Sequence, residues 1–128
     1  MKMLLVALAT LALCASPADK KKSSDVEILL VKAVHDGNEV TVDGRLRATA
    51  DKPLLDLTLE FVFLASGKQV VTTRTAAIDE PSLENGDEAA FHVVTSYPRN
   101  AIQILVRASA GGGRELIVAN PGPFPIEN

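Results

Sequence analysis

Apolar residues in this chain recur in short bursts that alternate with polar residues, and this pattern restricts the fold more than any other feature. Between Val40 and Thr49 the two kinds alternate one by one, and a second alternation runs from Leu55 to Phe63. A period of two is typical of a strand with one buried face. After residue 18 no stretch keeps a helical period. The chain is therefore expected to fold into an all-β domain.

The bursts are separated by turn-forming residues such as Asp36-Gly37, Pro53 and the run Gly111 to Gly113. They cover residues 26–34, 40–49, 55–63, 69–78, 89–95, 102–108 and 115–119. Short strands with a turn about every ten residues predict an immunoglobulin-like Greek-key β-sandwich of about seven strands. A small barrel is the main alternative. Because the chain has one Cys and no Trp, the architecture is predicted and not the antibody family.

The first 18 residues, MKMLLVALATLALCASPA, have the order of an export signal. A positive start at Lys2 is followed by an apolar run from Met3 to Leu13 and by small residues ending at Ala18. This run is shorter than the roughly 20 residues that span a bilayer. We expect a signal-peptide helix at 1–18, a polar tether at 19–25, the β-sandwich domain at 26–120 and a Pro-rich tail at 121–128. The protein is expected to be exported to a periplasmic or extracellular location.

Cys14 is the only cysteine, and two fates are open for it. The segment from Leu11 to Cys14 resembles a bacterial lipobox, in which the cysteine is lipidated and anchors the protein, although Leu13 stands where a lipobox has a small residue. If the signal is instead cut after Ala15 or Ala18, the mature chain has no cysteine. It then has no disulfide, thiol nucleophile or thiolate metal site.

Composition disfavours several classes of ligand. A net charge of -3 provides no overall positive field for a phosphate backbone, so we expect no nucleic acid partner. Aromatic residues are 4% with no Trp, which argues against a sugar-binding platform. His35 and His92 are the only histidines and are expected on the surface. No methionine follows Met3, so a copper carrier is disfavoured.

One stretch gathers acidic side chains in an expected loop between residues 79 and 88. They are Asp79, Glu80, Glu84, Asp87 and Glu88. Oxygen ligands on a flexible loop suit calcium, but the spacing does not match an EF-hand. Solvated loop charge is the preferred interpretation, and weak calcium binding at this loop is the alternative.

The sequence contains no recognisable catalytic motif. The mature part has neither a Gly-x-Ser-x-Gly elbow nor a Ser-x-x-Lys motif. Asp56 and Glu60 are expected on one strand face, as glycosidase acids might be, but a row of carboxylates between Thr and Val is the ordinary wet side of a sheet. We therefore predict a non-enzyme with no catalytic residues, no cofactor and no dedicated metal site.

From about Val40 to Val106, roughly half of its length, the chain resembles a group of bacterial extracytoplasmic domains. The features that carry the resemblance lie in residues 40–94, which read VTVDGRLRATADKPLLDLTLEFVFLASGKQVVTTRTAAIDEPSLENGDEAAFHVV. A strand ending near Gly, a long amphipathic strand, a Gly turn, a Val-Thr strand and a "Leu, acidic, Gly, then Phe-x-Val" segment occur in the order of FxLYD-like domains, with Leu64-Ala65 in place of the Tyr-Asp pair. The resemblance implies a β-sandwich module of the cell envelope or exterior that is not an enzyme.

Interaction with another envelope or extracellular protein is the function that these observations favour. Arg45, Arg47 and Arg74 are expected on outward strand faces, and exposed strands can accept a partner by edge addition, although the sequence does not say which edge. A small-ligand carrier or calcium binder that uses loop 79–88 is the alternative. A third possibility is an accessory subunit whose exposed Val62 and Leu64 are covered only in a complex. The oligomeric state is left open.

Overall fold

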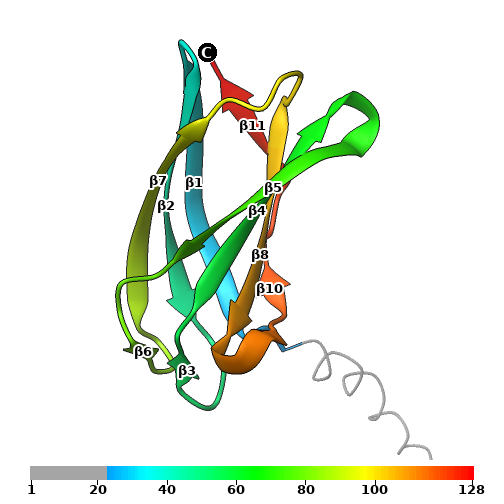
Figure 1. Ribbon diagram of the computed structural model, residues 1–128. Helices are drawn as coiled ribbons and strands as arrows, with labels where there is room; N and C mark the ends of the chain where they lie inside the picture. Colours follow the sequence, from blue (N-terminus) through cyan, green and yellow to red (C-terminus); the bar gives the residue numbers. More distant parts are fainter. Residues whose placement is uncertain (1–22) are drawn as a thin grey trace, which may run out of the picture.

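The computed structural model describes residues 23–128 (Figure 1). The predicted signal peptide with its helix, the fate of Cys14 and most of the predicted tether lie outside the described residues. At the end of the tether, Ser24 and Asp25 already contact the domain. The backbone N–H of Asp25 donates to the carbonyl of Ile117 at 2.8 Å, and the Ser24 hydroxyl lies 3.0 Å from the Thr49 hydroxyl.

Two layers of long antiparallel strands face each other (Figure 1). One layer contains β1 (Val26–Asp36), β2 (Glu39–Ala48) and β7 (Glu88–Ser96), and the other contains β4 (Thr58–Ala65), β5 (Gln69–Ala77) and β8 (Gln103–Ala110). Shorter strands are β3 (Leu54–Leu55), β6 (Ser82–Leu83), β9 (Arg114–Glu115), β10 (Val118–Ala119) and β11 (Phe124–Glu127). The predicted all-β sandwich is confirmed.

The two layers are joined along one side only. Strand β11 pairs antiparallel with β8 through Phe124 and Pro125, and parallel with β1 through Ile126 and Glu127. The strand order β5-β4-β8-β11-β1-β2-β7 is therefore one curled mixed sheet with two ends. Its ends, β5 and β7, do not pair with each other, so the barrel that was the alternative does not close.

The core lies between the layers and is built by alternation. All five positions predicted to face inward on β2, from Val40 to Ala48, are buried. On β4 the residues Leu59, Phe61 and Phe63 face the same core. No polar or charged residue between 23 and 128 is fully buried, so packing of apolar side chains holds the layers together.

The alternation predicted from Leu55 to Phe63 is wrong at its start. Asp56 has a φ of 52°, in the left-handed region, and this turn separates β3 from β4. As a consequence Leu54 is buried and Leu55 is exposed. The same turn removes Asp56 from the strand face that it was expected to share with Glu60.

The Pro-rich tail contributes strand β11 to the sheet. Proline lacks an N–H, but the residues between the prolines supply the bonds. The N–H of Ile126 donates to the carbonyl of Ile102 at 2.9 Å, and the carbonyl of Pro121 accepts from the N–H of Val106 at 2.9 Å. The alternation of proline with ordinary residues therefore lets β11 pair with β8 and β1.

Among residues 23–128 the structure contains no helix that is long and apolar enough to cross a bilayer.

Candidate functional site: the free edge of β7 and its groove

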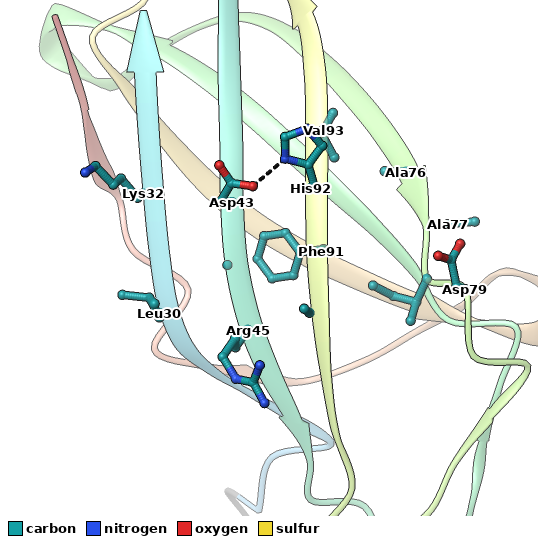
Figure 2. Close-up of a pocket in the computed structure, with 13 residues that line it drawn as sticks. Leu30, Lys32, Asp43, Arg45, Ala76, Ala77, Asp79, Phe91, His92 and Val93 are labelled. Atoms are coloured by element: carbon teal, nitrogen blue, oxygen red, sulfur yellow. Dashed lines mark hydrogen bonds and ion pairs between the residues drawn. The ribbon is translucent and has the colours of Figure 1, made fainter.

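A groove within the described part of the chain runs along β7, at the open side of the sandwich (Figure 2). Its volume is about 680 Å³. One wall consists of residues of β1, β2 and β7, and the other is the segment from Ala76 to Asp79 at the end of β5. The groove therefore follows the place where the two ends of the curled sheet approach each other.

A glycine on β2 shapes the groove from inside. Gly44 faces the core opposite Phe91, and the Phe91 ring lies directly over it. A Cβ at this position would overlap both the Phe91 ring and the carbonyl of Leu30. Because Gly44 has no side chain, Phe91 can pack inward against Phe61, with 5.8 Å between the ring centroids. The aromatic ring thus packs β7 closely against β2. The edge of β7 that faces away from β2 has no partner strand among the described residues.

A row of charged side chains crosses the outward surface beside the groove. Lys32, Asp43 and His92 occupy paired positions on β1, β2 and β7. His92 and Asp43 are in direct contact through Nδ1 and a carboxylate oxygen (Figure 2). Both side chains are more than half exposed, so the pair contributes little to stability. Among residues 23–128 no hydroxyl or thiol is shown hydrogen-bonded to this pair, so a third member of a hydrolytic triad is not present there.

A second row, further along the same surface, is an ion-pair network. Arg47 contacts Glu27 at 3.3 Å and Glu88 at 3.4 Å, and Arg45 contacts Glu88 at 3.1 Å. Hydrogen bonds from Arg45, and then from Arg47, hold the pKa of Glu88 below the ordinary value of a glutamate. The charged side chains of β7, Glu88 and His92, thus contact side chains of β2.

The hydrogen-bond pattern shows which groups of β7 are left unpaired. The N–H of Ala48 donates to the carbonyl of Asp87, and the N–H of Tyr97 donates to the carbonyl of Asn38, both at 2.8 Å. In an antiparallel pair the hydrogen-bonded positions recur every second residue. The odd-numbered residues of β7 therefore bond to β2, and the even-numbered ones direct N–H and C=O to the free edge. These residues are Glu88, Ala90, His92, Val94 and Ser96.

The free edge of β7 has few of the features that normally prevent strand addition. It is nine residues long, contains neither Pro nor Lys, and pairs with β2 without a bulge. Its inward side chains carry no charge, and Val94, on the outward face, is 49% exposed. Such an edge is a template for another strand.

The other free edge, on β5, is protected. Its pairing with β4 shifts register between Phe63 and Leu64, and Arg74 lies opposite the core residue Phe61. Arg74 therefore points inward, where Nε donates to the Thr95 hydroxyl at 3.0 Å. A bulge and an inward charge both oppose the addition of a strand. The prediction that Arg74 lies outward is wrong, whereas Arg45 and Arg47 do lie outward as predicted.

The acidic residues from Asp79 to Glu88 do not converge. Glu88 is engaged by two arginines, and a carboxylate oxygen of Asp87 accepts from the backbone N–H of Glu84 at 2.9 Å. Asp79 lies apart from them in the wall of the groove. Across residues 23–128 no three side chains of the metal-binding types gather.

Three further predicted surface residues are less exposed than expected. Val62 and Leu64 are 4% and 5% exposed, so the idea that a partner must cover them is wrong. Both lie on β4, a central strand that pairs with β5 on one side and β8 on the other. His35 is half-buried and stacks on Tyr97 with 3.7 Å between ring centroids. His92 is exposed, as predicted.

The free edge of β7 was not identified from the sequence. The segment EAAFHVVTS does contain a signal, because it lacks Pro and Lys and has no turn residue. That signal does not say whether another strand of the domain pairs with this edge. Only the strand order answers that question.

The chain matches no protein-family profile and no curated protein sequence. Among solved structures it is similar to a β-glucuronidase from glycoside hydrolase family 2, with a TM-score of 0.55, 12% identity and 75% of this chain covered. The chain spans only 12% of that enzyme's length. It is also similar to the C-terminal domain of wzt, with a TM-score of 0.52, 11% identity, and coverage of 83% of this chain and 81% of that one. At these identities the likeness concerns the fold alone, a β-sandwich domain.

Proposed function

We propose that this protein is a non-enzymatic, exported β-sandwich module that binds a partner protein by adding a strand of the partner to the free edge of β7. The observation that carries the proposal is that edge itself, with five residues whose backbone groups have no partner strand within residues 23–128. Backbone hydrogen bonds would supply affinity, and the groove would receive alternate side chains. The resemblance of residues 40–94 to FxLYD-like domains supports a role of this kind.

Photo-crosslinking in the producing cell tests this function. A photoreactive amino acid is placed at Val94, on the free edge, and at Leu55, which is similarly exposed but lies in the short β3 at one end of the sandwich. We expect an adduct of defined mass from position 94 and none from position 55. Equal labelling at both positions, or no adduct from position 94, would contradict the proposal.

Export is the part of the proposal that rests on residues 1–18. The intact mass of the protein recovered from envelope and medium fractions tests it. A chain that begins at Cys14 with added acyl mass would be a lipid-anchored form, and a chain that begins at Ser16 or Asp19 would be a soluble exported form. An uncleaved chain in the cytoplasm would overturn the proposed location.

A further inference from the structure

We infer that the strand received by β7 is β7 of a second copy of this chain. The inference rests on the proposed function, because it names the partner at the same edge. The two copies would pair antiparallel around a two-fold axis and form one continuous sheet in the order β1-β2-β7-β7-β2-β1. This is an isologous interface, in which each copy presents the same surface.

The register of such a pair follows from the strand. β7 runs from Glu88 to Ser96, so complete overlap of two copies places the two-fold axis at the middle residue, His92. His92 is also one of the residues that direct their backbone groups to the free edge. The register with complete overlap is therefore also one in which the backbone groups at the free edge of each copy face each other. In this register each copy donates five backbone N–H groups to the other.

The side chains that meet in this register are compatible. On the outward face Glu88 lies opposite Ser96 of the second copy, and Ala90 lies opposite its Val94. On the inward face Phe91 lies opposite Val93. The exposed Val94 gains an apolar neighbour, and an aromatic and a β-branched residue are placed across from each other. A shift of two residues in either direction loses one end of the overlap and two of the backbone hydrogen bonds.

The charges on this edge favour an identical strand over a charged peptide. Glu88 is already bound by Arg45 and Arg47 of its own chain and meets only a serine. The two His92 rings meet at the axis, and each contacts its own Asp43. No charge on β7 remains that would need an opposite charge on the partner.

The groove provides space on the side where the second strand would lie. Its far wall consists of Ala76, Ala77, Ile78 and Asp79, and three of these four are apolar. The inward side chains of the second strand would lie between this wall and Phe91 of the first copy. The edge of β5 does not compete as a pairing site, because Arg74 points inward there.

Sedimentation velocity over a wide range of concentrations tests the dimer, with the protein recovered from cells that express the full-length gene. We expect the apparent mass to double with rising concentration. Val94→Pro removes an N–H that points to the free edge and spares the bonds to β2, so it should abolish the doubling. Thr75→Pro is the matched control. The N–H of Ile78 donates to the carbonyl of Leu57, so by alternation Thr75 also faces a free edge, that of β5.

A second variant keeps the test decisive if proline disturbs folding. His92→Cys in a Cys14→Ser background places two thiols at the two-fold axis, where Cα atoms of a hydrogen-bonded pair are about 5.5 Å apart and a disulfide can form. Oxidation should yield a covalent dimer, whereas Thr75→Cys in the same background should stay monomeric. A monomer at all concentrations together with no crosslink at position 92 would overturn the inference.

Failure of this inference is distinguishable from failure of the proposed function. If position 94 crosslinks to a different protein and the purified chain stays monomeric, β7 is a docking edge and its occupant is not a second copy. If position 94 gives no adduct of any kind, both proposals fail. An adduct with twice the mass of the chain supports both.

Discussion

The two long sides of the sandwich differ in how the layers meet. On one side β11 bonds to β8 and to β1, so every strand there has a neighbour. On the other side β5 and β7 both end the sheet, and within residues 23–128 the one side-chain hydrogen bond shown between them runs from Arg74 to Thr95. The closed side stabilises the domain, and the open side leaves backbone groups available for another chain. Under the proposed function, stability and binding lie on opposite sides of one small core.

Removal of β11 should have the largest effect on stability, because this strand joins the two layers on the closed side. A chain that ends at Pro123 loses the half-buried Phe124 and Ile126 and exposes edges of β8 and β1. We expect the free energy of unfolding to fall by about 3 kcal/mol. Urea unfolding followed by far-ultraviolet circular dichroism measures it.

The control for this truncation is Val70→Ser on the exposed edge strand β5, where the side chain is 61% exposed. It should change the free energy of unfolding by less than about 0.5 kcal/mol. Equal losses for the two variants would show that the closed side carries no special share of the stability.

A side chain at position 44 should disturb the packing of β7 on β2, on the open side of the sandwich. Gly44→Ala places a Cβ against the Phe91 ring and the Leu30 carbonyl, so β7 must shift away from β2. We expect a loss of about 2 kcal/mol in the free energy of unfolding. Gly111→Ala is the matched control, because its Cβ would find its nearest neighbour at 3.5 Å. If both variants are equally stable, the close approach of Phe91 to Gly44 does not exist in solution.

Arg74→Val tests whether the inward arginine is what distinguishes the free edge of β5 from that of β7. The substitution removes the inward charge that protects β5 and gives up the hydrogen bonds to Thr72 and Thr95. We expect a stability change within about 1 kcal/mol and additional association through β5. Sedimentation velocity of Arg74→Val combined with Val94→Pro isolates this association from that of β7. A monomeric double variant would mean that Arg74 does not protect the edge.

The smallest expected effect concerns the charges beside β7. The pKa of Glu88 is lowered in the folded protein by Arg45 and Arg47, so its contribution to stability is present above the ordinary glutamate pKa of 4.5 and is lost as the pH falls through the lower folded value. Glu88→Gln should therefore reduce the fall in the urea midpoint between about pH 5 and pH 3, the range in which glutamates titrate. Because the carboxylate is exposed, the change is expected to be slight. An unaltered pH dependence would mean that these arginines do not hold the carboxylate in solution.

The long strands could be predicted because each obeys a local rule. The alternation from Val40 to Ala48 needs only one buried and one wet face, and the structure confirms it residue by residue. Prediction was wrong where a neighbour far along the chain decides the outcome. Val62 and Leu64 have outward positions by alternation, yet both are buried on the central strand β4. The strand in the Pro-rich tail was not predicted, because its partners β8 and β1 lie far away in the sequence.

The candidate site was less predictable than the fold. Edge addition was foreseen as a mode of binding, and the arginines of β2 were placed outward, but Arg74 was not distinguished from Arg45 and Arg47. All three alternate with apolar residues or threonines in the sequence. Arg74 turns inward because β5 is an end of the sheet, where the guanidinium can reach the Thr95 hydroxyl across the open side. No local pattern contains that information.

The sequence by itself determined the fold class, the positions of the long strands and most of the inward-facing residues, because periodicity and turn residues act over a few residues. The tertiary structure alone decided that β11 joins the two layers, that β5 and β7 end the sheet, and that Gly44 lies under Phe91. These features depend on strand order and close approach between segments tens of residues apart. Whether a strand lies at an edge depends on which other strands pair with it, and the residues of the strand itself do not specify those partners.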